Sequence, residues 1–404
     1  MATSELPDRE AEDAARTVSR KIAADYDAYV YDPTPPGGDF AARLFGAGAL
    51  YGCAPAMGDV LDLGCGTGRF LEVIARGLRG RAVGIDLSAA AVAQAKVNCA
   101  TLGDRARIVQ ADILDVEPRD LGQFDLVCNV GVHYVVPPEV RRRLTQLAAA
   151  CLRPGGLLLI SYYVGPVMHA RTALYRLLRA KDNPDAPPPE RVAAARRHLK
   201  AVKGAAAGLR DQALIESIAR SVLGLKDATL FHEVFNPLLE VLDTESVAAD
   251  LAPWGLRFLT FANGGHHGGL GTSRERLSAT ADQDMLSGGY RYALFGKTGD
   301  ADAIFDIRTP NVRWRLNGKP LPELSDAQNG VYEVPPGGRH VKVNYKVTRF
   351  ALALLEGAEK PLAELTEAAR RHMPGFDPDG DVQRLERNMA LLWSLGLVQA
   401  VRGG

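Results

Sequence analysis

The chain has 404 residues, of which 47% are hydrophobic and 24% are charged, a composition typical of soluble globular proteins with a substantial core. The 48 Lys and Arg residues equal the 48 Asp and Glu residues, so the formal net charge is zero, which argues against the basic surface of a nucleic-acid-binding protein. The length is enough for about two to three domains.

The five cysteines lie within the first 151 residues, and none forms a C-x-x-C pair, which argues against a disulfide framework or a zinc site. The first residues, MATSELPDREAED, are polar and acidic, unlike a signal peptide. Apolar runs stay shorter than the ~20 residues that a membrane span requires. We therefore predict a cytoplasmic protein without a membrane partner.

Alternating strand and helix patterns dominate the first half of the chain. A tyrosine-bearing helical segment, ARTVSRKIAADYDAYVYD, is expected within an N-terminal helical cap of residues 1–50. From residue 60 onward, short β-branched runs alternate with amphipathic helical patterns, which is typical of βαβ units in a parallel sheet. Strands are predicted at 60–64, 82–86, 106–111, 125–130 and 157–163, with Pro-Gly-Gly at 154–156 ending the helix before the last of these.

An alanine- and arginine-rich helical insertion is predicted next, over about 166–250. The runs at 256–263 and 290–297 are expected to complete the sheet as an antiparallel pair. Residues 51–299 are thus predicted to form one Rossmann-like α/β domain. Residues 300–404 combine strand-rich text with two helices and a short final strand, which predicts a small winged-helix-like α+β domain.

Three alternating glycines follow the first strand in VLDLGCGTGRF, where Gly64, Gly66 and Gly68 open a helix. Such a turn brings backbone N–H groups close to a ligand. The dinucleotide fingerprint is G-x-G-x-x-G, spaced for a pyrophosphate, whereas here the spacing is G-x-G-x-G and Asp62 precedes it. A carboxylate in that place disfavours a diphosphate and favours a cationic amino-acid end. S-adenosylmethionine has that chemistry, because it carries an ammonium and a sulfonium but no phosphate.

Acidic residues at the next strand ends predict the rest of the cofactor site. Asp86 ends the second strand, at roughly the twenty-residue offset where such folds hydrogen-bond the ribose hydroxyls. Asp112 follows the third strand, where a carboxylate can accept from the adenine amino group. Leu87 and Ile113 are expected to sandwich the adenine ring, and Asn129, at the end of the fourth strand, is also assigned to the cofactor.

Residues 60–163 resemble the seven-stranded class I S-adenosylmethionine-dependent methyltransferases. Other segments resemble the bacterial protein lysine methyltransferases with a methyltransferase regulatory domain. These segments are YDAYVYDPTPP, GVHYVVP (131–137), SYYVGPVMH (161–169), PPPERVAAARRHL, TLFHEVFNP and LSGGYRYALFGK. The resemblance covers most of residues 20–297, and the last hundred residues resemble the family's winged-helix-like tail. It implies lysine N-methylation.

The acceptor-side segments depart from the family's pattern. The family's tyrosine, serine and tryptophan are His133, Tyr134 and Val135 here, its asparagine is Tyr163, and its glycine–tryptophan is Val167-Met168. Methylation of a peptide carboxylate or of another side chain therefore stays open beside lysine.

Candidate catalytic residues lie near the ends of the fourth and fifth strands, because ligands sit outside the carboxyl ends of parallel strands. An amine must arrive deprotonated, and an aromatic lining both desolvates it and tolerates the cationic product. Tyr134, Tyr162 and Tyr163 are the candidates for this lining, and His133 is the candidate general base. The alternatives are packing roles for the tyrosines and a structural role for His133.

The segment NGGHHGGLG (263–271), with His232 and Glu233, raises the question of a metal site. Glycines on both sides of the two histidines favour a loop instead, and we predict no metal.

The leading hypothesis is an S-adenosylmethionine-dependent methyltransferase acting on a protein or peptide. One alternative is a small-molecule biosynthetic methyltransferase. Another is a non-catalytic regulator that senses the cofactor and binds a protein or DNA. The neutral C-terminal region, with fourteen acidic and fourteen basic residues from Asp300 to Gly404, argues against DNA, because phosphate-driven affinity needs clustered cations. The sequence leaves the oligomeric state open.

Overall fold

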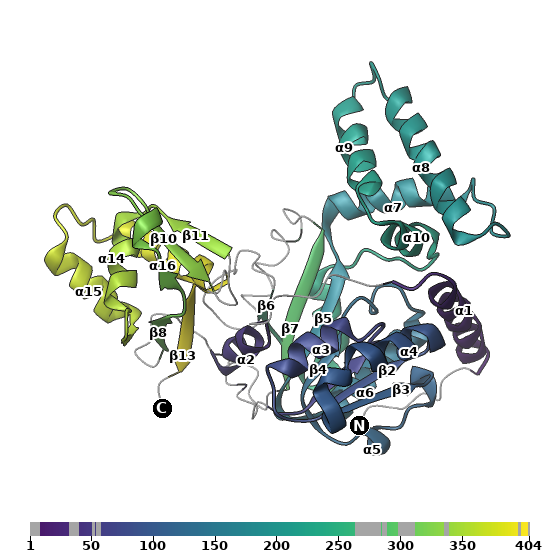
Figure 1. The fold of residues 1–404 in the computed structure, drawn as a ribbon, viewed down its shortest axis with the longest axis horizontal. Coiled ribbons are helices and arrows are strands. Elements are labelled where there is room, and N and C mark those ends of the chain that lie inside the picture. Colours follow the sequence, from purple (N-terminus) through teal and green to yellow (C-terminus); the bar gives the residue numbers. More distant parts are fainter. Residues whose placement is uncertain are drawn as a thin grey trace.

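A seven-stranded sheet forms the centre of the molecule (Figure 1). The computed structural model describes residues 9–31, 40–50, 53, 58–262, 284, 289–297, 312–334, 339–394 and 397–402. The strand order is β3-β2-β1-β4-β5-β7-β6, in which β7 runs antiparallel to both β5 and β6. The Rossmann-like sheet and its antiparallel pair are therefore confirmed. The strands are β1 (Val60–Leu63), β2 (Ala82–Asp86), β3 (Ala106–Gln110), β4 (Phe124–Asn129), β5 (Leu152–Tyr163), β6 (Leu256–Phe261) and β7 (Tyr290–Lys297).

Helices cover both faces of the sheet, and alternate side chains of a strand pack into the hydrophobic core on one face or on the other. In β5, Leu157 and Leu159 belong to the buried cluster that includes α2 and α3. Leu158 and Ile160 belong to the cluster on the other face, with α6 and α11, because successive side chains of a strand point to opposite faces. The helices of this body are α2 (Phe40–Leu50), α3 (Arg69–Arg76), α4 (Ala89–Asn98), α5 (Pro118–Leu121), α6 (Pro138–Cys151) and α11 (Thr244–Leu251), with short 3₁₀ turns η1 (Ala100–Arg105), η2 (Ile113–Asp115) and η3 (Ala252–Trp254).

The predicted boundary of the fifth strand was too late in the chain. Helix α6 ends at Cys151, before the Pro-Gly-Gly, and β5 begins directly after it. Phe124 pairs with Leu152 and Leu126 pairs with Leu157, so the register shifts across residues 153–156. The Pro-Gly-Gly therefore forms an irregularity inside the strand rather than a loop before it.

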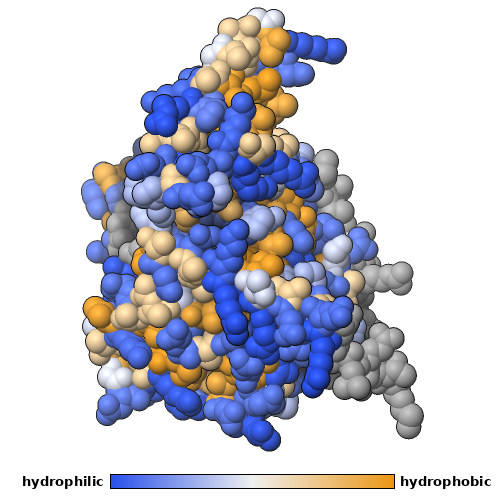
Figure 2. All heavy atoms as spheres, turned by 90° about the vertical axis from the view of Figure 1, so that its right-hand side faces the viewer, coloured by the Kyte–Doolittle hydropathy of each residue, from blue (hydrophilic) through white to orange (hydrophobic). Residues whose placement is uncertain are grey.

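The helices inserted after β5 project beyond the sheet (Figure 1) and have a small core of their own. Buried Tyr175, Leu199, Val222 and Phe231 are among the residues that form it. Figure 2 looks onto the side that carries this insertion, whose upper end mixes hydrophobic and hydrophilic side chains. The inserted helices are α7 (Gly165–Arg179), α8 (Pro188–Ala205), α9 (Gln212–Leu223) and α10 (Asp227–Phe235).

The first helix, α1 (Arg9–Ala28), packs against α4 and α6. Near one end, Arg16 forms ion pairs with Asp115 at 2.9 Å and with Asp112 at 3.4 Å. At the other end, Asp27 accepts hydrogen bonds from the Ser88 hydroxyl and the Ala90 backbone N–H. These contacts hold α1 across the carboxyl ends of β2 and β3.

The described residues of the C-terminal part form two small three-stranded sheets and three α-helices. Helix α2 contacts both β13 and the large sheet, and one buried cluster includes Leu44 of α2 together with Trp314 of β8. The order α15, turn, α16, strand agrees with the predicted order, and the winged-helix-like description stays a prediction. The elements are β8 (Val312–Leu316), β9 (Lys319–Pro320), η4 (Pro322–Leu324), β10 (Gly330–Val334), β11 (Arg339–Val343), α14 (Lys346–Leu354), β12 (Glu359–Pro361), α15 (Leu362–His372), α16 (Gly380–Ser394) and β13 (Val398–Arg402).

All five cysteines are free and buried. In the part of the chain that the structure describes, no helix is long and apolar enough to span a bilayer.

Candidate functional site

The glycine turn after β1 adopts a backbone that only glycine accepts readily. Gly64, Gly66 and Gly68 have φ values of 80°, 51° and 72°, in the left-handed region. A Cβ on Gly64 would lie 2.4 Å from Val132 Cγ2, and one on Gly68 would lie 3.0 Å from Cys99 Sγ. A Cβ on Gly66 would meet no atom within 4 Å. Gly64 and Gly68 thus permit close packing, while Gly66 presents bare backbone to open space.

Asp62 is a buried carboxyl group whose Oδ1 has no hydrogen-bond partner among the described residues. Asp62 is 2% exposed to solvent. Burial, with the nearby charge of Asp86 as the second cause, raises the pKa of Asp62 to about 8. An unpaired buried carboxyl group is costly, so Asp62 is suited to a cationic ligand group such as an ammonium.

Asp86 is held in a fixed orientation by the glycine turn and by the next helix. Its Oδ2 accepts a hydrogen bond from the Gly66 N–H at 2.8 Å, and its Oδ1 accepts from the Ser88 N–H at 2.9 Å. Burial raises the pKa of Asp86. Each oxygen keeps a second lone pair, so Asp86 can accept from two neighbouring hydroxyl groups, as the ribose prediction requires.

The predicted adenine end lies beneath α1. Leu87, Asp112 and Ile113 all line the same cavity as Asp62 and Asp86. Asp112 caps η2 by accepting from the Leu114 N–H at 3.0 Å. Its other oxygen faces Arg16 at 3.4 Å, so α1 and the adenine end are directly linked.

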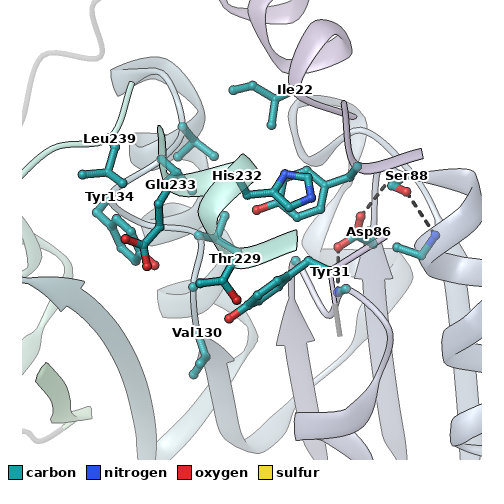
Figure 3. Close-up of a pocket in the computed structure, with 18 of the residues that line it drawn as sticks. Ile22, Tyr31, Asp86, Ser88, Val130, Tyr134, Thr229, His232, Glu233 and Leu239 are labelled. Atoms are coloured by element: carbon teal, nitrogen blue, oxygen red, sulfur yellow. Dashed lines mark hydrogen bonds between the residues drawn. The ribbon is translucent and has the colours of Figure 1, made fainter. Parts of the chain in front are cut away.

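One cavity of about 720 Å³ joins these residues to the tyrosines near the ends of β4 and β5, a volume within the usual range for cofactor and small-molecule sites. Figure 3 shows Asp86 and Ser88 at one end, with Tyr134 and Glu233 at the other. Ile22 of α1 lies over the space between the two ends. The described lining residues that are solvent-exposed are Gly224 and Lys226, which indicates that the mouth lies near the start of α10.

Three tyrosine rings pack edge to face at the end of the cavity away from Asp86. The centroids of Tyr134 and Tyr163 are 4.7 Å apart, those of Tyr163 and Tyr290 are 5.1 Å apart, and those of Tyr134 and Tyr290 are 6.1 Å apart. Ser161 fixes this group, because its hydroxyl accepts from the Gly131 N–H and lies 2.7 Å from the Tyr290 hydroxyl. The result is an aromatic surface facing the cavity.

The structure brings most of the predicted site residues together and leaves four outside the described lining of the cavity. Tyr162 is fully buried and donates a hydrogen bond to Thr244 Oγ1 at 2.9 Å. Asn129 and Gly68 are also buried and are not part of the lining.

His133, the candidate general base, is the fourth residue outside the lining. It is 1% exposed, and neither ring nitrogen has a hydrogen-bond partner among the described residues. Burial, followed by the charge of Arg141, lowers the pKa of His133 to about 3.

Several cavity residues were not among the predicted site residues. Glu233 was considered only as a metal ligand, yet it lines the tyrosine end. Tyr26 of α1 stacks on His232 of α10, with ring centroids 3.9 Å apart and an interplanar angle of 15°. The tyrosine-bearing lead-in and the TLFHEVFNP segment were signals for these residues, but nothing in them specified the contact. The other lining residues missed include Arg171, Thr229, Tyr290 and Tyr292.

His232 connects α10 to α1 through its ring. Its Nε2 donates to the Tyr29 carbonyl oxygen at 2.6 Å, and burial lowers its pKa to about 4. Within the described ranges, no group of three or more His, Cys, Asp or Glu side chains is placed to hold a metal ion. The histidine pair at 266–267 lies outside the described residues.

Comparison with known proteins identifies the domain around the glycine turn. Residues 60–156 match the family model described as "Methyltransferase domain". A carboxy-S-adenosyl-L-methionine synthase from Chromohalobacter salexigens is 37% identical over 110 residues, which cover 25% of this chain and 38% of the relative. A ribosomal protein L11 methyltransferase from Geobacter metallireducens is 34% identical over 104 residues, covering 26% and 32%. The chain thus spans about a third of the length of these curated relatives.

A much longer stretch matches a solved structure. PKMT2 from Rickettsia typhi, in complex with AdoHcy, superimposes with a TM-score of 0.65 at 16% sequence identity. The match covers 92% of this chain and 77% of that chain. The shared fold therefore extends well beyond residues 60–156.

Proposed function

We propose that this chain, which has the class I methyltransferase fold, is an S-adenosylmethionine-dependent methyltransferase acting on a protein or peptide. The single observation that carries the proposal is the continuous cavity. It joins Asp62, Gly66 and Asp86 at one end to the ring of tyrosines at the other. A methyl donor bound at the first end would face an acceptor bound at the second.

The residues at the first end fit the cofactor. Asp62 can bind its ammonium, Gly66 can let its amino-acid end approach the backbone, and Asp86 can accept from both ribose hydroxyls. When bound, S-adenosylmethionine supplies an electrophilic methyl group on a sulfonium whose departure leaves a neutral thioether. The protein's own contribution is to align the acceptor and to exclude water.

The case for a macromolecular acceptor rests on the additional parts of the molecule. Helices α7 and α10 and the turn between α9 and α10 contribute residues to the cavity lining. In the same insertion, Leu209 lies between α8 and α9 and Leu214 lies on α9, and both side chains are exposed. The fold of these parts and of the C-terminal elements is shared with PKMT2, since the match covers 92% of the chain. The matched L11 methyltransferase is named for a protein acceptor. The segments that resemble bacterial protein lysine methyltransferases make lysine the first acceptor to test.

A small-molecule acceptor is the second candidate, and the low solvent exposure of the described lining residues favours it. Helix α1 and the inserted helices both contribute to the lining, and its described solvent-exposed members are Gly224 and Lys226. A compact substrate would fit such a chamber, whereas a peptide would have to insert one side chain through the mouth.

Calorimetric titration of the full chain with S-adenosylhomocysteine tests the cofactor. Asp86→Asn should weaken binding by about tenfold or more, because hydrogen bonds to a charged group contribute about 1.5–3 kcal/mol. Asp104→Asn is the matched control, since Asp104 is exposed and does not line the cavity. Equal affinity of the wild type and Asp86→Asn would contradict the assigned ribose site, and no binding to either would reject the cofactor.

Transfer of an isotope-labelled methyl group distinguishes the two acceptor classes. The wild-type protein is incubated with labelled S-adenosylmethionine and with either the protein fraction or the small-molecule fraction of a cell extract. Label in protein, mapped by mass spectrometry to peptides gaining methyl groups, is the expected result. Label confined to small molecules would favour the second candidate.

A further inference from the structure

Glu233 of α10 is an acidic side chain at the tyrosine end of the cavity (Figure 3). Its side chain is 11% exposed. It lies close to Tyr134 in the close-up, on the opposite side of the cavity from Asp86. A carboxylate in such a position must have partners or a ligand, because burying an unpaired charge is costly.

One oxygen of Glu233 is fully engaged by the protein. Oε2 accepts from Arg171 Nη2 at 2.9 Å and from the Tyr175 hydroxyl at 2.5 Å. Both donors belong to α7, so this helix fixes the position of the carboxylate. Oε1 accepts a hydrogen bond from the Tyr163 hydroxyl at 2.7 Å. A carboxylate oxygen can accept two, which leaves Oε1 able to accept from a ligand in the cavity.

The surroundings of Oε1 suit a cation. The rings of Tyr134, Tyr163 and Tyr290 line the same end of the cavity, and aromatic faces attract an ammonium group. The hydrogen bond from Tyr163 keeps its ring beside the carboxylate. A cationic group placed there would meet both a negative charge and aromatic rings.

The charged residues that line the whole cavity also favour a cationic acceptor. Its described lining includes four acidic residues, Asp62, Asp86, Asp112 and Glu233, and two basic residues, Arg171 and Lys226. The ion pair of Arg171 with Glu233 offsets both charges, and Lys226 is exposed, so the three other acidic side chains still outnumber the one remaining basic side chain of the lining. A carboxylate acceptor would therefore approach an acidic chamber, whereas an amine acceptor would be attracted to it.

We propose that Glu233 binds the ammonium group of the acceptor and removes one of its protons before methyl transfer. This inference rests on the proposed methyltransferase function. One N–H bond of the ammonium breaks and an O–H bond forms on Oε1. The freed nitrogen lone pair then forms a bond to the methyl carbon as the carbon–sulfur bond breaks, and that electron pair stays on sulfur. The product is a methylated ammonium and a neutral thioether.

The test uses three synthetic probes that differ in one group. In each, a nitrogen replaces the sulfonium of S-adenosylmethionine and carries an added arm reaching toward the acceptor end. The arm terminates in a primary amine, a methyl group or a carboxylate. Calorimetric affinities are measured for the wild type, for Glu233→Gln and for Glu190→Gln. Glu190 is exposed on α8 and does not line the cavity, which makes it a matched control.

The wild type and Glu190→Gln should bind the amine-armed probe at least about tenfold more tightly than the methyl-armed probe, as expected for a charge-assisted hydrogen bond. Glu233→Gln should lose this preference while its affinity for S-adenosylhomocysteine stays unchanged, which also shows that the variant is folded. Glutamine can still accept from Arg171 and donate to the Tyr163 oxygen, so the variant keeps its packing contacts.

Two results would overturn the inference while leaving the proposed function in place. The first is a wild type that binds the methyl-armed or carboxylate-armed probe as tightly as the amine-armed probe. The second is a Glu233→Gln variant that retains the preference for the amine. Both comparisons are made with protein that binds S-adenosylhomocysteine, so they are separate from failure of the proposed cofactor. A protein that binds neither S-adenosylhomocysteine nor any probe would overturn the inference together with the proposed function.

Discussion

Asp62 differs from the other acidic residues of the cavity in having an oxygen without a protein partner among the described residues. Burial is the main cause that raises its pKa to about 8, so it is mostly protonated at pH 6.5. A bound ammonium would stabilise the charged form and lower the pKa again. Cofactor binding should therefore expel a proton from Asp62.

Proton release can be measured by calorimetry at pH 6.5. The observed enthalpy of S-adenosylhomocysteine binding should differ between phosphate and imidazole buffers, because up to about one proton is released to the buffer. Asp62→Asn should abolish the difference and weaken binding by about tenfold or more. Asp104→Asn should behave like the wild type. A wild-type enthalpy that is independent of the buffer would contradict the assigned role of Asp62.

His133 is buried without a hydrogen-bond partner in the described part of the chain, and its pKa is lowered to about 3. In the unfolded chain a histidine titrates near pH 6.5. Between these values the unfolded state binds a proton that the folded state does not. The stability that depends on His133 is thus complete above about pH 6.5 and is lost as the pH falls toward 3.

His133→Leu should remove this acid sensitivity. Near neutral pH its free energy of unfolding should equal or exceed that of the wild type, because an unpaired buried polar group is removed. Below pH 6.5 the advantage of the variant should grow by up to about 1.4 kcal/mol per pH unit. Urea unfolding at several pH values measures this gap. Methyl transfer should persist in the variant, and its loss would restore His133 as a candidate base.

Helix α1 is the element that closes the cavity over the cofactor end. Its residues Ser19, Ile22, Ala23 and Tyr26 line the cavity, and the stacking of Tyr26 on His232 joins it to α10. The two helices are about 200 residues apart in the chain, as the Tyr29–His232 separation of 203 shows. Opening of α1 would therefore uncover both the cofactor end and the region of the mouth.

Tyr26→Ala should loosen this closure. We expect S-adenosylhomocysteine to bind more weakly and dissociate faster, by an amount near the 0.5–1.5 kcal/mol that a ring pair contributes, or roughly 2- to 12-fold. Tyr26→Phe keeps the ring and should remain close to the wild type. Stopped-flow dissociation gives the rates, and hydrogen exchange of α1 should rise in the alanine variant alone. Unchanged rates in Tyr26→Ala would mean that α1 does not control access.

At the scale of the molecule, α2 connects the sheet to the C-terminal elements. Leu44 is 1% exposed and shares one buried cluster with residues of α3, β5 and β8. Helix α2 also contacts β13. Because the same helix packs on both parts, weakening it should affect both.

Leu44→Ala should lower the free energy of unfolding by about 2–5 kcal/mol, the usual cost of such a truncation in a core. Hydrogen exchange should accelerate both in strands of the large sheet and in β13. Leu214→Ala is the matched control, because Leu214 is 57% exposed, and it should change stability by no more than about 0.5 kcal/mol. Faster exchange confined to one part would show that the two parts are not coupled through α2.

The sequence alone predicted most of the residues that line the proposed cofactor end of the cavity, with Gly68 and Asn129 as the exceptions. A strand, a glycine turn and a helix are adjacent in the chain, so VLDLGCGTGRF carries its own geometry, and the strand-end positions of Asp86 and Asp112 follow from the parallel sheet. The five predicted strands of the parallel part are present, and the error at β5 arose because its irregular register at residues 153–156 depends on pairing with β4.

Only the tertiary structure decided the acceptor half. Tyr134, Tyr163, Glu233 and Tyr290 come from four separate segments, and each segment alone is compatible with simple packing. The sequence offered Tyr162 and Tyr163 as equal candidates for the aromatic lining. Because side chains alternate along a strand, they point in different directions, and the Tyr162 hydroxyl donates to Thr244 whereas the Tyr163 hydroxyl donates to Glu233. A motif whose residues are neighbours in the chain can be predicted from the sequence. A pocket formed by residues that are distant in the chain depends on long-range contacts, which cannot be inferred from one sequence.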